Sequence, residues 1–303
     1  MLNEEMFTPL LDLNISLSNE IRIDKYIEVL EDFTQLWGND IHFFSQNISK
    51  YKHLNELLLT LQKLDLATYS FIDGALTNQF NFISDRTIDL FIKGNVNAFG
   101  FIINEKLILN NRYVDYVKEL TKKFANIETY YKVDNTNYIY MKNVLNFCIK
   151  NKIKLCIIDI DKKSKNRIYR KQYKEALEKW VLGNKDNKIK ISFAECPYIN
   201  IFNKVNINML GGCSAGITSC MIDENGNLIP CMYLTEVKLG NINKQSLKNL
   251  WNNDLFNKLR NRNNLEGKCS ICKYVKICGG CRAESYYKTG NLFGEDTNCW
   301  MEV

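Results

Sequence analysis

The first two thirds of the chain alternate between strand-like and helix-like segments, and this alternation limits the folds open to it. Six segments have the apolar pattern of a strand: residues 10–16, 40–45, 67–72, 97–104, 127–133 and 154–160. Each precedes a segment with helical periodicity: residues 24–37, 53–64, 87–93, 111–124, 138–150 and 170–182. Strands that alternate with helices predict a parallel sheet, because parallel strands need crossover connections. Six units are too few for a closed eight-unit barrel, so we expect an α/β fold built on an open, partial (βα)6 TIM-like barrel.

The pattern changes after a seventh strand-like segment, residues 188–194. Turn residues multiply there, helical patterns become scarce, and most of the cysteines follow. We therefore place a domain boundary near residues 196–210. It divides the chain into a barrel domain over residues 1–200 and a cysteine-rich domain over residues 201–303.

The N-terminus and the composition point to a cytoplasmic protein. The first residues, MLNEEMFTPLLDLNIS, are acidic where a signal peptide is basic, and no apolar run approaches the ~18 residues of a membrane span. The most basic stretch, residues 161–179, carries eight basic residues but no aromatic stacking motif, and we interpret it as solvated surface, with no nucleic-acid partner. In the cytoplasm clustered cysteines bind metal more often than they form disulfides.

The segment CMIDENGNLIPC, from Cys220 to Cys231, has the pattern of a β-hairpin with Asn225–Gly226 at its turn. A two-residue loop would place Cys220 directly opposite Cys231 on one face, with Cα atoms about 5.5 Å apart. A disulfide also suits that spacing. In a cytoplasmic chain with more cysteines nearby we favour metal ligation.

A second cysteine group follows the spacing C-x2-C-x5-C-x2-C: Cys269, Cys272, Cys278 and Cys281, with Cys299 further on. Two C-x2-C pairs can bind structural zinc, but only five residues separate them, against about 15–20 in the usual zinc ribbon. Close thiolates with one remote ligand are typical of cubane iron–sulfur clusters. The two histidines lie in the other half of the chain: His42 is near the end of an expected strand, and His53 is near the start of an expected helix. All-thiolate ligation is therefore expected.

From Cys213 onward this pattern resembles the SPASM domain, the auxiliary-cluster module of many radical SAM enzymes. The segment LGNINKQSLKNLWNNDLFNKLRNR and the motif CGGCRAE resemble that family's signatures, over about residues 210–303. By position, the resemblance implies two [4Fe–4S] clusters, each with four protein ligands. Auxiliary cluster I would be held by Cys213, Cys220, Cys231 and Cys281, and auxiliary cluster II by Cys269, Cys272, Cys278 and Cys299. Three cysteines remain: Cys148 and Cys156 are expected in the core, and Cys196 has no assigned role.

The resemblance to radical SAM enzymes fails at two places in the barrel domain. Those enzymes hold their catalytic cluster on a CxxxCxxC motif after the first strand, but here LSNEIRI follows it, and the first 147 residues contain no cysteine. After the second strand FFSQNISKYKHL stands in place of a GGEP-like segment that contacts SAM. We therefore expect no SAM binding, no catalytic residues and no radical SAM catalysis by the chain itself.

These features predict a degenerate, pseudo-radical-SAM protein with an intact SPASM domain. By analogy with the family, it would support an active radical SAM enzyme in peptide or protein maturation, through electron relay or binding of a precursor peptide. Two alternatives stay open: a stand-alone iron–sulfur redox enzyme with an unrecognised active site, and a structural zinc protein.

Overall fold

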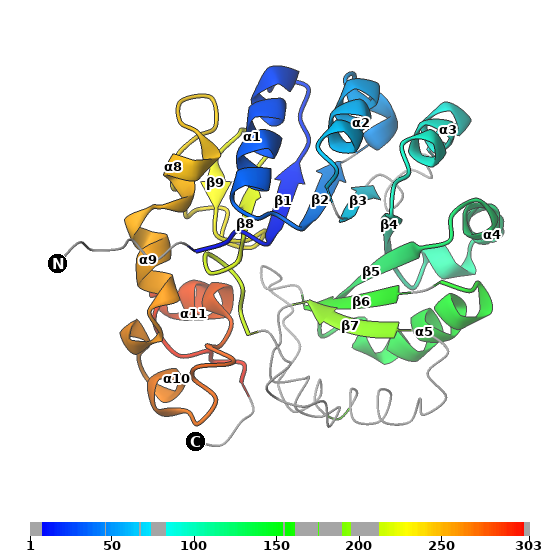
Figure 1. Ribbon diagram of the computed structural model, residues 1–303. Coiled ribbons are helices and arrows are strands. Elements are labelled where there is room, and N and C mark those ends of the chain that lie inside the picture. The colour runs from blue at the N-terminus through cyan, green and yellow to red at the C-terminus, as the bar shows by residue number, and fades with distance from the viewer. Residues whose placement is uncertain are drawn as a thin grey trace.

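The structure, a computed structural model, describes residues 8–45, 47–66, 68–73, 83–153, 155–160, 175, 190–194 and 212–299. Its strands form one sheet in the order β7-β6-β5-β4-β3-β2-β1-β8-β9 (Figure 1). They are β1 (Asp12–Ser16), β2 (Asp40–Ser45), β3 (Thr68–Asp73), β4 (Ala98–Ile103), β5 (Ile127–Val133), β6 (Leu155–Ile160), β7 (Lys190–Ala194), β8 (Ser219–Ile222) and β9 (Leu228–Ile229).

The barrel strands follow the predicted pattern. The strands β1 to β7 pair in parallel with their sequence neighbours, and all seven match predicted segments within a few residues. Five helices lie on the outer side of the arc, each between consecutive strands: α1 (Ile23–Gln35), α2 (Leu54–Lys63), α3 (Asp85–Lys93), α4 (Asn111–Lys123) and α5 (Met141–Lys150) (Figure 1). Among the described strands β7 and β9 form the two edges, so the arc is open. The expected helix over residues 170–182 lies outside the described residues, Glu175 excepted.

The sheet continues beyond β1, and the sequence pattern did not predict this extension. Strand β8 pairs in parallel with β1, with Leu13 opposite Cys220, and β9 then adds antiparallel to β8. The cysteine-rich region thus continues the sheet of the barrel through backbone hydrogen bonds. Its two strands contribute to the hydrophobic core of the barrel, through Cys220 and Ile222 of β8 and Leu228 of β9.

Side chains on β1, β2 and β5 alternate between a buried and a more accessible face, whereas β4 is buried at nearly every position. In β1 the residues Leu13 and Ile15 are buried while Asp12, Asn14 and Ser16 are partly accessible, and β5 alternates in the same way. Since successive strand residues point to opposite faces, one face packs under the helices and the other lines the inside of the arc. Polar residues on a parallel strand are thereby concentrated on the inner, concave face.

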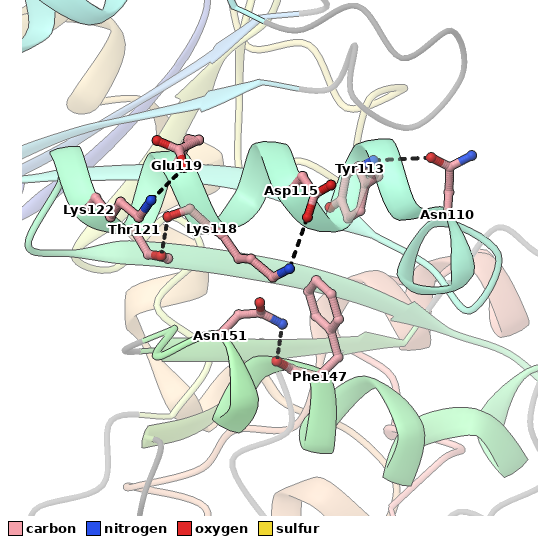
Figure 2. A network of polar contacts seen from close by, with 9 residues as sticks. All are labelled: Asn110, Tyr113, Asp115, Lys118, Glu119, Thr121, Lys122, Phe147 and Asn151. Atoms are coloured by element: carbon pink, nitrogen blue, oxygen red, sulfur yellow. Dashed lines mark hydrogen bonds and ion pairs between the residues drawn. The ribbon is translucent and has the colours of Figure 1, made fainter.

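The outer helices are fixed by local polar contacts. Asn110 caps α4, because its side-chain oxygen accepts a hydrogen bond from the Tyr113 amide at 3.1 Å. Along α4 the pairs Lys118–Asp115 and Lys122–Glu119 lie one turn apart on the exposed surface (Figure 2). The end of the next helix, α5, is closed by Asn151, whose side-chain amide donates to the Phe147 carbonyl at 2.8 Å.

The cysteine-rich region also contains short helices: α8 (Leu247–Trp251), α9 (Asp254–Arg260), α10 (Lys268–Ile271) and α11 (Arg282–Thr289). Helix α8 packs beside α1, and the backbone amide of Lys248 donates to Asp32 at 3.3 Å. The fully buried Trp251 donates from its indole Nε1 to the Thr8 carbonyl at 2.8 Å. These contacts join the start of the chain to the region between the two cysteine groups.

Candidate functional site

The Cys220–Cys231 hairpin exists, but its register differs from the prediction by one residue. Met221 lies opposite Ile229 and Ile222 opposite Leu228, so Cys220 falls opposite Pro230 and not opposite Cys231. The prediction that the two thiols sit directly opposite each other on one face is therefore wrong. A shift of one residue reverses which face each side chain occupies.

The turn explains the shift. The Asp223 amide donates to the Asn227 carbonyl at 2.9 Å, which leaves three residues in the loop instead of two. The Asp223 carboxylate also accepts hydrogen bonds from the amides of Asn225 and Asn227, at 2.9 and 2.8 Å. Gly226, with φ of +79°, takes the left-handed position that a three-residue hairpin loop requires. The aspartate before Asn225–Gly226 was the available signal for this longer loop.

Three of the four cysteines assigned to auxiliary cluster I line one cavity. Cys213, Cys231 and Cys281 contribute to its wall, and its volume is about 380 Å³. Cys220, the fourth, is fully buried in the adjacent core and does not line the cavity. Burial raises the pKa of its thiol, and the nearby Arg260 guanidinium partly offsets that rise.

The concave face of the barrel also lines this cavity. Its lining residues lie on four strands: Asn14, His42, Phe44, Glu128, Tyr130, Leu155 and Ile157. Burial lowers the pKa of His42, opposed by the Asp40 carboxylate, so the imidazole is neutral at pH 7. The tyrosine hydroxyl of Tyr130 donates to Glu128 at 3.4 Å. Cys213, Cys231 and Cys281 thus share a pocket with both polar and apolar groups of the barrel.

The second group gathers around the loop between α10 and α11. Cys269 and Cys299 act electrostatically on Cys278, so these three thiols lie close together. Burial raises the pKa of the Cys278 thiol to about 12. Cys272 lies on the same loop, directly after α10. The two cysteine groups are in contact, because the backbone amide of Cys213 in the first group donates to the carbonyl of Cys278 in the second at 3.0 Å.

Hydrogen bonds aimed at sulfur show that these residues fit thiolate ligands. Backbone amides donate to the sulfur atoms of four cysteines at 3.3–3.5 Å: Tyr274 to Cys272, Gly280 to Cys278, Glu284 to Cys281 and Asp296 to Cys269. Such N–H···S bonds accompany the cysteine sulfurs of iron–sulfur clusters and tune their potentials. Among the described residues, no three His, Cys, Asp or Glu side chains converge as ligands of a single metal ion do.

Two glycines hold the loop close to the sulfur atoms. Gly279 and Gly280 have φ of +68° and +65°, a left-handed conformation that costs little only for glycine. A Cβ at Gly280 would lie 2.9 Å from the sulfur of Cys269. The CGGC segment is therefore shaped so that its backbone lies close to the sulfur of Cys269.

The segment that follows β1 is short, and its two apolar side chains are buried. Six residues separate β1 from α1, and within them Leu17 and Ile21 are buried. The Tyr26 hydroxyl accepts from the Ser18 amide at 3.0 Å, and Asn19 accepts from the Lys52 amide at 3.0 Å. The β1–α1 loop is thus tied both to its own helix and to the segment after β2.

The remaining cysteines and histidines have structural roles where they are described. Cys148 on α5 and Cys156 on β6 are fully buried, which confirms that they belong to the core. Cys148 lies 3.5 Å from the Thr129 hydroxyl. His53 stands at the start of α2, as expected. Cys196 lies outside the described residues.

Comparison with known proteins gives a family match for the cysteine-rich region. The SPASM family, described as an iron–sulfur cluster-binding domain, matches residues 213–282. This segment is a SPASM domain. It contains seven of the eight assigned cysteines, and only Cys299 lies beyond it.

Curated relatives match mainly this SPASM region. An AdoMet-dependent heme synthase of Methanosarcina barkeri is 42% identical over 92 residues, which are 30% of this chain and 26% of the relative. A pre-heme d1 synthase of Dinoroseobacter shibae is 26% identical over 132 residues, 40% of this chain and 32% of the relative. The match thus spans only about a quarter to a third of these relatives.

The fold of the whole SPASM-containing chain resembles that of Streptococcus suis SuiB. The structure of SuiB bound to S-adenosylmethionine superposes with a TM-score of 0.75 at 17% identity, covering 97% of this chain and 78% of SuiB. SuiB bound to its precursor peptide SuiA gives the same TM-score and identity, over 97% of this chain and 76% of SuiB. The fold is therefore an open, TIM-like α/β arc with a SPASM region. In the part of the chain that the structure describes, no helix has the length and apolarity to cross a bilayer.

Proposed function

We propose that this protein is an iron–sulfur accessory protein that supports an active radical SAM enzyme in the maturation of a peptide or protein. It would carry two [4Fe–4S] clusters in a C-terminal domain over residues 201–303, attached to a degenerate barrel over residues 1–200. Its part would be to relay electrons or to bind a precursor peptide, in the cytoplasm, where thiols stay reduced.

The observation that carries the proposal is a contrast between the SPASM cysteines and the loop that follows β1. On the SPASM side, Cys213, Cys231 and Cys281 face the cavity, and sulfur atoms nearby accept backbone hydrogen bonds. At the carboxyl end of β1, where a radical SAM enzyme holds its catalytic cluster, the loop has no cysteine and buries Leu17 and Ile21. Auxiliary clusters without a catalytic cluster suit a partner better than a complete radical SAM enzyme.

When bound, the clusters would accept and release single electrons. The residues of the chain would hold them through four thiolates each: Cys213, Cys220, Cys231 and Cys281 for cluster I, and Cys269, Cys272, Cys278 and Cys299 for cluster II. Full thiolate ligation leaves no iron site open to SAM or to a substrate. The concave face around Asn14 and Glu128 would then offer a peptide-binding wall opposite cluster I.

The test is to purify the protein without oxygen, count iron and sulfide, and record EPR spectra with and without SAM. About eight irons per chain and a spectrum indifferent to SAM support the proposal, since each cluster has four irons. A spectrum that shifts with SAM, or about twelve irons, would refute it. Capture of a radical SAM enzyme that carries the cysteine motif supports the partner role, whereas substrate turnover by the chain alone favours the stand-alone redox enzyme.

Single substitutions test the ligand assignment. Cys272→Ala should lower the iron content from about eight to about four per chain, because it removes one ligand of cluster II. Cys148→Ala is the matched control: Cys148 is buried in the barrel core, so the iron content should stay at the wild-type value. Equal iron in both variants would contradict the assignment.

A further inference from the structure

Two arginines between the cysteine groups have buried N–H groups without a hydrogen-bond acceptor. In the described part of the chain the buried side-chain atoms without a partner include Nε of Arg260 and Nη1 of Arg262. An unmet buried donor is costly, and more so on a charged group, so each one calls for an explanation.

Arg262 lies at the junction of the two cysteine groups. Its Nη2 donates to the carbonyl of Cys213, a cluster I residue, at 3.1 Å. Its guanidinium also interacts electrostatically with the thiols of Cys213, Cys278 and Cys269, the last two from the cluster II set. Because the Cys213 amide bonds to the Cys278 carbonyl, both groups are within reach of this one side chain.

Gly279 leaves the space that this guanidinium occupies. A Cβ at Gly279 would lie 2.1 Å from Nη1 of Arg262, so any side chain there would displace it. The unpartnered Nη1 therefore lies against the CGGC loop, between Cys278 and Cys281 in sequence. The hydrogen bond that Arg262 makes to the Cys213 carbonyl uses Nη2, and Nη1 has no acceptor among the described residues.

We propose that Arg262 is a positioning residue shared by both cluster sites, placing one positive charge between them and offering its Nη1–H to the sulfur atoms bound there. This inference rests on the proposed function, because it requires that both clusters are present. A positive charge near a cluster stabilises the reduced form, which carries one more negative charge, and so raises the reduction potential. Arg262 would thus raise the potentials of both clusters together.

Two neighbouring arginines each interact with only one group. Arg260 acts electrostatically on Cys220, a cluster I residue, and its guanidinium stacks 4.3 Å from the centre of the Trp251 ring. Arg282 donates to the sulfur of Cys269, a cluster II residue, at 3.7 Å, and to the carbonyls of Leu292 and Gly294. Arg260 can therefore serve as a one-cluster control for Arg262.

The experiment is an EPR-monitored redox titration of the full chain, purified without oxygen and carrying its iron. R262Q should lower both midpoint potentials, R260Q should lower that of cluster I alone, and R22Q, at an exposed site on the barrel, should change neither. R262K keeps the charge and should restore both potentials toward the wild-type values. Potentials of R262Q equal to wild type, or a shift confined to one cluster, would overturn the proposal.

Iron content separates the possible failures. A wild type with about eight irons and an R262Q variant with unchanged potentials would reject the role of Arg262 but not the cluster assignment. A wild type without iron would reject both. If R262Q binds little iron, the R262K variant decides the question. Near-normal iron content and potentials in R262K support the shared charge, whereas low iron or shifted potentials in R262K count against it.

Discussion

Replacing Trp251 by phenylalanine tests how the two cysteine groups are anchored to the barrel. The indole is fully buried, donates to the Thr8 carbonyl at 2.8 Å, and packs edge-on against Phe256 at 5.1 Å between ring centres. The Arg260 guanidinium lies 4.3 Å from the centre of its ring. Trp251→Phe keeps an aromatic ring but removes the hydrogen bond and part of the packed surface.

The expected loss can be worked out from these contacts. The deleted hydrogen bond is worth about 1 kcal/mol. A smaller ring weakens the cation–π contact with Arg260 by about 0.5–1 kcal/mol. The space left by the missing ring atoms costs a further ~1–2 kcal/mol, because a packed core closes only partly around it. We expect Trp251→Phe to lower the free energy of unfolding by about 2.5–4 kcal/mol.

The assay is urea unfolding without oxygen, followed by far-UV circular dichroism, with the midpoint shift converted through the m value. Trp37→Phe is the matched control, because that side chain is 69% exposed, and it should change stability by less than about 0.5 kcal/mol. If Trp251→Phe were as mild as Trp37→Phe, the indole would not anchor the SPASM region and the reasoning would fail.

Three further outcomes are expected. Burial, aided by Asp40, raises the pKa of Asp12 from 3.8 to about 6, so the folded state holds this proton more tightly and stability falls as pH rises through that interval. Asp12→Asn should flatten the stability curve there, and an unchanged slope would argue against it. Asp223→Ala removes the acceptor of the hairpin turn and should destabilise the protein by about 1–3 kcal/mol in urea melts, with Glu224→Ala as the neutral control. Tyr26→Phe should raise amide hydrogen exchange at Ser18, whereas equal exchange would show that the hydroxyl does not hold the β1–α1 loop.

The positions of the outer helices and of the core cysteines show which features the local sequence pattern can predict. The five described outer helices could be placed from apolar periodicity because that pattern reflects each segment's own exposure to the core. Cys148 and Cys156 were assigned to the core for the same reason. Cysteine spacing likewise indicated the SPASM domain, since ligand spacing is a property of the chain itself.

The register of the Cys220–Cys231 hairpin could not be predicted from the local sequence pattern. Asn225–Gly226 signalled a turn, but its length depended on the Asp223 side chain competing for backbone amides, which no periodicity records. One residue in the loop then decided whether Cys220 faces Cys231.

The sequence by itself thus determined the seven-strand parallel arc, the SPASM cysteine pattern and the missing CxxxCxxC motif. Only the tertiary structure decided that β8 extends the sheet beside β1, so that Cys213 and Cys231 line one cavity together with Asn14 and Glu128. It alone also placed Arg262 between Cys213 and Cys278. These are contacts between segments far apart in the chain, and they arise from packing around a common core, which no local pattern of residues specifies.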